Sequence, residues 1–282
     1  MVIEQKWDQL KALLHDMHAA VLAYSGGVDS SLLLRAAAEV MGTNLIAVTA
    51  VSETYPQGEL AAAQEFARSL GVTHRIIHTE ELSSEDFVRN PPERCYHCKK
   101  ELFEKLSRLA LAEGVPCVME GSNTDDLSDH RPGRKAAGEF SVRSPLLEAG
   151  FSKAEVRERA RALHLPVWDK PSLACLSSRI PYGTRITPGL IRLVEAAEDH
   201  LRVFGFRQAR VRHHGDIARI EVMPEDFAKL LSRDITEKIA ARFKELGYVY
   251  VCLDLEGYRT GSMNEGMDRM RIADCGLRNG KL

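Results

Sequence analysis

The chain has 282 residues, of which 44% are hydrophobic and 28% are charged, and its formal net charge is -2. These values fit a globular protein of one large or two smaller domains, and the near-neutral charge argues against a nucleic-acid partner. No apolar run approaches the roughly 20 residues of a membrane span, and the N-terminal segment lacks the apolar core of a signal peptide. We therefore expect a cytoplasmic protein with no membrane partner.

The first half of the chain alternates short apolar segments with helical patterns. Strands are predicted at 19–24, 45–52, 74–78 and 115–120, and helices at 30–41, 58–70 and 96–113. A glycine follows each helix, as expected of a C-terminal stop. This order predicts an α/β fold with a doubly wound, mainly parallel sheet covered on both faces. Such sheets bind ligands beyond the carboxyl ends of their strands.

The second half of the chain predicts a smaller α+β domain. Ser152 and Glu155 form a capping-box pattern at the start of a helix. A further helix is predicted at 188–204, strands at 209–213, 218–223 and 248–253, and a hairpin turn at Gly215-Asp216. We place the first domain at 1–170, a cysteine-bearing connecting loop at 171–186, the second domain at 187–266 and a tail, expected to be disordered, at 267–282.

A glycine-rich string, SGGVDS at 25–30, joins the first strand to the first helix. Backbone amides of Gly26 and Gly27, together with the helix N-terminus, predict an anion site. Ser25 and Ser30 could donate hydroxyl groups to phosphate, and Asp29 could help to hold Mg²⁺. The alternative is an ordinary tight turn with an Asp-Ser cap.

A second polar string, EGSNTDD at 120–126, follows the fourth strand at the same predicted sheet edge. Asp125 and Asp126 could complete a Mg²⁺ site with carboxylate oxygens. The alternative is an acidic loop without a ligand.

Six cysteines in a cytosolic chain suggest buried thiols, metal ligands or reactive sulfur rather than disulfides. Cys95 and Cys98 lie one helical turn apart at a helix start, which favours thiolate. They could be half of a zinc site, a redox pair or two core thiols. Cys175 lies in a polar loop where Lys170 and Arg179 would favour a thiolate, unless it is a buried structural cysteine. Two cysteines in apolar strands are predicted to be core residues, Cys117 and Cys252.

The strings at 25–30 and 120–126 resemble two segments of the PP-loop ATP pyrophosphatases. That resemblance implies cleavage of ATP between its α- and β-phosphates. It implies nucleotide contacts from the first string and from Asp125, with Mg²⁺ held by Asp29 and Asp125.

Four longer strings resemble the LarE family, CYHCKKELF at 95–103, SPLLEAGFSKAEVRERA at 144–160, KPSLACLSSRIPYG at 170–183 and LDLEGYRTGSMNE at 253–265. The family makes the sulfur groups of the nickel-pincer nucleotide, the cofactor of lactate racemase. The resemblance covers about residues 5–266. It implies that ATP adenylylates a carboxylate of pyridinium-3,5-biscarboxylic acid mononucleotide, which then becomes a thiocarboxylate. It also implies a homo-oligomer, a sulfide donor, and nickel-inserting and carboxylating enzymes as functional neighbours.

Two sulfur sources are known in that family. In one type, a single cysteine, here Cys175, gives up its sulfur and becomes dehydroalanine. In the other type, three cysteines hold a [4Fe-4S] cluster whose open iron binds hydrosulfide. The presence of Cys95, Cys98 and Cys175 favours the cluster type.

Arginines of the second domain are candidates for substrate binding. Arg210 and Arg212 alternate on a predicted strand and so share one face, and guanidinium forks suit phosphate and carboxylate. Glu195 and Glu198 share a helix face. Arg179, which flanks the Cys175 loop, is a further candidate. The resemblance implies substrate contacts from Glu198, Arg210 and Arg212, whereas the alternative is a solvated basic face. The aromatic residues Tyr96, Trp168 and Tyr182 are predicted to be core residues.

Other function classes share parts of this pattern. A tRNA sulfurtransferase has the same loop and can carry three cysteines, but usually adds a basic RNA-binding surface. An ammonia-dependent amidating synthetase explains the loop but not the cysteines. A nucleotide-gated metal sensor would bind ATP without releasing pyrophosphate.

Overall fold

A computed structural model describes residues 2–55, 58–127, 132–171 and 174–265. The chain forms two compact units, one of Met1–Phe87 and Glu93–Leu173, the other of Val88–Pro92 and Ala174–Leu282. The segment from Ala174 onward, predicted as part of a connecting loop, belongs to the second unit. The predicted tail at 267–282 lies outside the described residues.

The first unit contains a four-stranded parallel sheet in the order β3-β2-β1-β4. Its strands are β1 (Ala20–Ala23), β2 (Leu45–Val51), β3 (Thr73–His78) and β4 (Val118–Met119). All four predicted strands are confirmed, although β4 is shorter than expected. β3 is mostly exposed because it is an edge strand and its sequence, THRIIH, is not continuously apolar.

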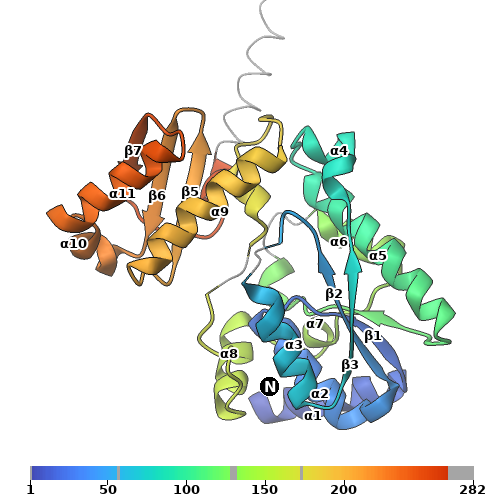
Figure 1. Cartoon of the computed structure of the whole chain (residues 1–282). Helices are drawn as coiled ribbons and strands as arrows, with labels where there is room; N and C mark the ends of the chain where they lie inside the picture. The colour runs from blue at the N-terminus through green and yellow to red at the C-terminus, as the bar shows by residue number, and fades with distance from the viewer. Residues whose placement is uncertain (1, 56–57, 128–131, 172–173, 266–282) are drawn as a thin grey trace, which may run out of the picture. The chain divides into compact units, whose positions relative to one another are not determined.

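Helices cover both faces of this sheet, as predicted (Figure 1). Ala20 and Leu22 of β1 point to one face, whereas Val21 points to the other, because side chains alternate along a strand. The first face packs against α1 (Ile3–Met17), α2 (Val28–Met41), α3 (Glu59–Ser69), α7 (Pro145–Glu148) and α8 (Lys153–Ala162). The second face packs against α5 (Arg94–Ala112) and α6 (Gly133–Glu139). The short α4 spans Glu85–Val88.

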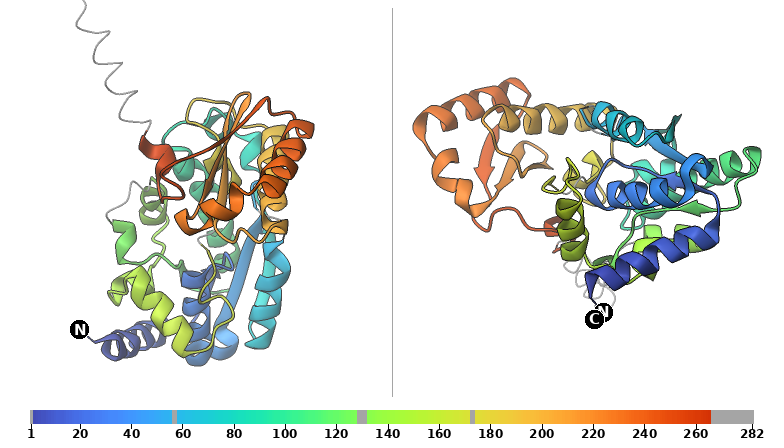
Figure 2. Two further views of the ribbon diagram at one scale, coloured as in Figure 1. Left: turned by 90° about the vertical axis from the view of Figure 1, so that its left-hand side faces the viewer. Right: turned by 90° about the horizontal axis from the view of Figure 1, so that it is seen from below.

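The second unit contains a three-stranded sheet in the order β5-β6-β7. β5 (Ala209–His214) and β6 (Ile217–Val222) are antiparallel, and β6 is parallel to β7 (Tyr250–Leu253). The predicted hairpin turn is confirmed, with Gly215 in the left-handed region at a φ of 63°. The helices α9 (Pro188–Val203) and α11 (Arg233–Glu245) pack on one face of this sheet (Figures 1 and 2). The short helix α10 spans Phe227–Leu230.

None of the helices in the described parts of the chain is long and apolar enough to cross a membrane.

The capping box at α8 gives a direct test of local helix stabilisation. Ser152 Oγ accepts the Glu155 amide at 3.3 Å, and the Glu155 carboxylate accepts the Ser152 amide at 2.8 Å. We expect Ser152→Ala to lower the free energy of unfolding by about 1 kcal/mol, because one amide of the first turn loses its acceptor. Urea denaturation of the full chain measures this loss. Ser232, which begins α11 without a side-chain cap bond, is the matched control, and an equal loss in Ser232→Ala would contradict the capping account.

Candidate functional site

The loop between β1 and α2 has the geometry of an anion site. Gly26 adopts a φ of 72°, a left-handed conformation that favours glycine, and Gly27 is the N-cap of α2. The hydroxyl oxygens of Ser25 and Ser30 lie 3.1 Å apart, and Ser30 Oγ donates to the Gly27 carbonyl at 3.2 Å. The first amides of α2 have no intrahelical acceptor, so the loop and the helix end together present several N–H donors.

The second predicted loop lies against the first. A Cβ on Gly121 would stand 2.9 Å from the Ser30 amide nitrogen, so this position accepts only glycine without a backbone shift. Asn123 Nδ2 donates to Asp29 Oδ1 at 3.0 Å. The two polar strings therefore meet at one edge of the sheet, beyond the carboxyl ends of β1 and β4.

Asp29, a predicted Mg²⁺ ligand, already has partners on both carboxylate oxygens. Asn123 donates to one oxygen, and the ammonium of Lys153 contacts the other. Asp125 is exposed, whereas Asp126 is buried and accepts the Asn123 amide at 3.0 Å. Asp29 and Asp125 supply the carboxylate oxygens that Mg²⁺ prefers, and a cation at Asp29 would share that side chain with Lys153. Lys153 was not predicted as a site residue, although it lies in the string at 144–160 that resembles the LarE family.

The three predicted sulfur ligands are divided between the units. Cys95 and Cys98 lie on the first turns of α5, with Cys95 exposed and Cys98 half-buried. Cys175 is exposed and precedes a 3-10 turn, η4 (Leu176–Arg179), of the second unit. Among the described residues of either unit, no group of three or more His, Cys, Asp or Glu side chains is arranged for a metal ion. A meeting of the three cysteines stays a prediction.

Two predictions about core residues were wrong. Cys252 is exposed because β7 is an edge strand and this residue does not point to the packed face. Trp168 is 38% exposed and lies under the guanidinium of Arg161, 5.2 Å from the ring centroid. Cys117 is half-buried, and burial raises the pKa of its thiol.

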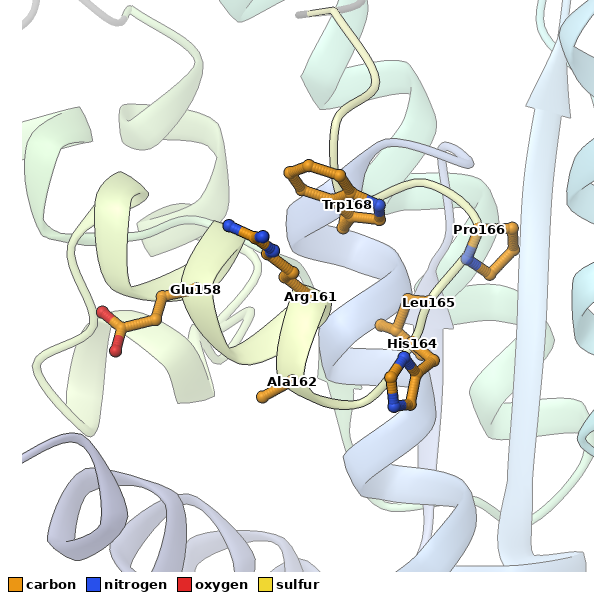
Figure 3. Close-up of a pocket in the computed structure, with 7 residues that line it drawn as sticks. All are labelled: Glu158, Arg161, Ala162, His164, Leu165, Pro166 and Trp168. Carbon is orange, nitrogen blue, oxygen red and sulfur yellow. The ribbon is translucent and has the colours of Figure 1, made fainter.

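Trp168 borders an open pocket of about 610 Å³ at the C-terminal end of α8 (Figure 3). Its lining combines Arg161, Leu165, Pro166 and Trp168 with other residues of the same segment. None of the predicted site residues lines it.

One face of the second unit's sheet is charged. Val211 of β5 points into the apolar core, so its neighbours Arg210 and Arg212 point to the opposite face, as predicted from their alternation. Opposite them on β6 stand Glu221 and Arg219. Arg210 and Arg212 are each only 6% exposed, so this face is a buried charged layer and not a solvated strand.

Arg179 and Glu198 form a buried ion pair beside β5. The guanidinium donates to both carboxylate oxygens at 2.7 and 2.8 Å, and the Val211 amide donates to Glu198 at 3.0 Å. Burial alone would raise the pKa of Glu198, but the charge and hydrogen bonds of Arg179 hold it below its ordinary range. Arg179 also donates to the carbonyl oxygens of Ala174 and Cys175, at 2.8 and 3.2 Å. The ion pair thereby fixes the backbone at the predicted sulfur residue.

Arg212 has a partner that sequence reasoning missed. Two of its nitrogens donate to one oxygen of the fully buried Glu221, at 3.0 and 2.7 Å. The other oxygen of Glu221 accepts Ser262 Oγ at 2.7 Å. A third nitrogen of Arg212 donates to the Ser178 carbonyl at 3.1 Å. The alternation of Arg219 and Glu221 along β6 was the only sequence signal for this network.

Arg210 is buried near both members of the Arg179–Glu198 pair. Burial, and then the charge of Arg179, lower its pKa to about 10, and its guanidinium lies 5.4 Å from the centroid of the Tyr258 ring. Among its described residues, the second unit therefore buries three arginines, Arg179, Arg210 and Arg212, and two glutamates, Glu198 and Glu221. Guanidinium groups are suited to bind phosphate and carboxylate.

The Arg179–Glu198 pair predicts a pH-dependent stability difference. We expect Glu198→Gln to lower the free energy of unfolding by about 3 kcal/mol near neutral pH, because it leaves a buried arginine without its carboxylate. Since the folded-state pKa of Glu198 is lowered, its contribution exists above the ordinary pKa of 4.5 and disappears as pH falls through the folded value. Denaturation at several pH values measures the difference. The exposed neighbour Asp199, changed to Asn, is the control, and a deficit that grows on acidification would refute the assignment.

We expect a glycine-to-alanine substitution to have opposite effects on stability at positions 121 and 138. Gly121→Ala places a methyl group against the backbone of α2, so we expect a loss of stability and weaker nucleotide binding. Gly138→Ala, in α6 and with no described group within 4 Å of the added carbon, should gain up to about 1 kcal/mol. Thermal unfolding and calorimetric titration with ATP compare the two. Equal effects would show that the approach of residue 121 to α2 is not a constraint.

The chain is similar in sequence to several known proteins. Residues 16–160 match the family described as asparagine synthase. An uncharacterised protein of Synechocystis, slr1717, is 43% identical over 263 residues, which cover 93% of this chain and 98% of that one. The pyridinium-3,5-bisthiocarboxylic acid mononucleotide synthase of Lactiplantibacillus plantarum is 38% identical over 94% of this chain and 95% of its own length. A protein of Methanocaldococcus jannaschii, MJ0830, is 31% identical over 85% and 90% of the two chains.

The match at 16–160 spans the parallel sheet and both polar loops, and the similarity to the synthase runs nearly from end to end. The chain therefore belongs to the LarE family of pyridinium-3,5-bisthiocarboxylic acid mononucleotide synthases and contains their PP-loop α/β domain.

Proposed function

We propose that this protein is an ATP-dependent sulfurtransferase that converts carboxylates of pyridinium-3,5-biscarboxylic acid mononucleotide to thiocarboxylates. The observation that carries the proposal is the similarity to the named synthase over 94% of this chain. The meeting of the two polar loops supports it, because an adenylylating enzyme needs an anion site beside carboxylates that can hold Mg²⁺.

In the first unit, the proposed roles concern ATP. The amides of Gly26 and Gly27 and the α2 N-terminus would bind phosphate oxygens, with hydroxyl donors from Ser25 and Ser30. Asp29 and Asp125 would hold Mg²⁺. These groups would stabilise the charge that develops as a substrate carboxylate oxygen bonds to the α-phosphorus and pyrophosphate leaves.

In the second unit, the proposed roles concern the substrate. Arg179, Arg210 and Arg212 would bind its phosphate or its carboxylates, and Glu198 would hold Arg179 in place. The support is the burial of these three guanidinium groups within one unit, and Arg210, with a pKa of about 10, is charged near neutral pH. The acyl adenylate then loses AMP when sulfur bonds to the acyl carbon, and a thiocarboxylate results.

For the sulfur, we propose that Cys95, Cys98 and Cys175 hold a [4Fe-4S] cluster. The donor set fits this group, since thiolates are its usual ligands and two of the three residues are exposed. When bound, the cluster would supply one iron without a protein ligand, where an external sulfide donor can deliver sulfur. Cys175 as a sacrificed sulfur is the competing proposal. We also propose that the protein forms a homo-oligomer. Nickel-inserting and carboxylating enzymes would be its functional neighbours.

The cysteines give the decisive test. Protein purified without oxygen should contain about four iron and four sulfide per chain, and Cys95→Ala, Cys98→Ala and Cys175→Ala should each lose both. With ATP, Mg²⁺, sulfide and the dicarboxylate, the wild type should form AMP, pyrophosphate and thiocarboxylate over many turnovers. The variants should lose the thiocarboxylate, detected by mass spectrometry.

Cys252→Ala is the matched control, since this cysteine is also exposed but has no proposed role. Conversion of Cys175 to dehydroalanine in a single turnover, without iron, would replace the cluster by the sacrificial mechanism. A wild type that binds ATP but forms no AMP with the dicarboxylate would overturn the proposed reaction.

A further inference from the structure

Two side chains hold the glycine-rich loop from outside. Tyr55 Oη donates to the Ser25 carbonyl at 3.3 Å. Lys170 Nζ donates to the next carbonyl, that of Gly26, at 3.2 Å. Two consecutive peptide oxygens of the loop therefore accept hydrogen bonds from residues that lie far away in the sequence.

These contacts determine where the following amides point. The described chain contains no cis peptide bond, and in a trans peptide the N–H points opposite to the carbonyl of the preceding residue. The Gly26 and Gly27 amides must therefore point away from Tyr55 and Lys170. In agreement, the Gly27 amide nitrogen faces Ser25 Oγ at 3.4 Å, beside the hydroxyl of Ser30. This is the side on which the phosphates are expected.

Lys170 is itself held in place. Its ammonium contacts the Glu59 carboxylate of α3, and the two side chains are only 19% and 21% exposed. Its backbone carbonyl accepts Arg157 Nη2 at 2.9 Å. Lys170 is therefore held both at its ammonium group and at its backbone carbonyl.

Tyr55 is the second donor to the loop, and its hydroxyl is protonated near neutral pH. Burial, and then the charge of Glu59, raise the pKa of this hydroxyl to about 12. A Cβ on Gly26 would lie 3.2 Å from Ala63 Cβ and 3.9 Å from Tyr55 Oη. The loop at Gly26 is therefore close to Ala63 of α3 and to the Tyr55 hydroxyl, and these groups restrict rotation of its peptide planes.

We propose that Tyr55 and Lys170 are positioning residues that set the Gly26 and Gly27 amides for the phosphates of ATP. This inference rests on the ATP site of the proposed function.

The first test is binding of α,β-methylene-ATP with Mg²⁺ to the full chain, measured by calorimetry. We expect Tyr55→Phe and Lys170→Met each to weaken binding about tenfold, because a misdirected amide loses a charge-assisted hydrogen bond. Lys170→Arg, which keeps a donor, should recover most of the affinity. Affinity equal to the wild type in both Tyr55→Phe and Lys170→Met would overturn the inference.

Lys6→Met is the matched control. Lys6 also donates to a glycine carbonyl, that of Gly150, at 2.7 Å and pairs with a glutamate, Glu155, at 2.6 Å. Its side chain is 15% exposed, close to the value for Lys170. This variant should unfold at a lower temperature but bind the analogue like the wild type. Equal weakening in Lys6→Met would show that general destabilisation, and not peptide orientation, explains the loss.

The second test measures AMP formation by the wild type with ATP, Mg²⁺ and the dicarboxylate. A wild type that binds the analogue but forms no AMP would refute the proposed reaction and leave the positioning roles standing. A wild type that does not bind the analogue would overturn both.

Discussion

The pairing of β1 with β2 on one side and with β4 on the other is the constraint on which the nucleotide site depends. Because all these strands are parallel, their carboxyl ends lie at one edge, and the loops after β1 and β4 become neighbours. The bond from Asn123 to Asp29 then becomes possible, and so does the approach of Gly121 to the first turn of α2. A glycine is needed there because strand spacing brings two backbones together.

In the second unit, the main constraint is the cost of burying charged side chains, which opposite charges offset. Burying an arginine or a glutamate alone would cost several kcal/mol, so each buried charge in this unit requires a partner. Glu198 and Glu221 supply those partners for Arg179 and Arg212. The same contacts reach the backbone at Ala174, Cys175 and Ser178. Charge pairing and the placement of the cysteine-bearing loop are therefore one network.

Much of the fold and part of the candidate site could be predicted from local sequence. The apolar strands, the terminating glycines, the capping box at Ser152 and the shared face of Arg210 and Arg212 depend on short-range periodicity, and the structure agrees. Lys153, Gly121 and Glu221 could not be assigned, because their partners lie far away in the sequence. Cys252 was assigned wrongly because an apolar string does not reveal which strand forms a sheet edge. The meeting of Cys95 and Cys98 with Cys175 is a question of how two units are arranged, which no local pattern contains.

Arg210 keeps its charge near neutral pH although its pKa is lowered. A guanidinium with a pKa of about 10 stays protonated throughout the neutral and acidic range. A phosphate monoester loses its second proton near a pKa of about 6. If Arg210 binds such a group, acidification toward pH 6 would protonate the phosphate and not the guanidinium, so the pH dependence of that contact would follow the phosphate.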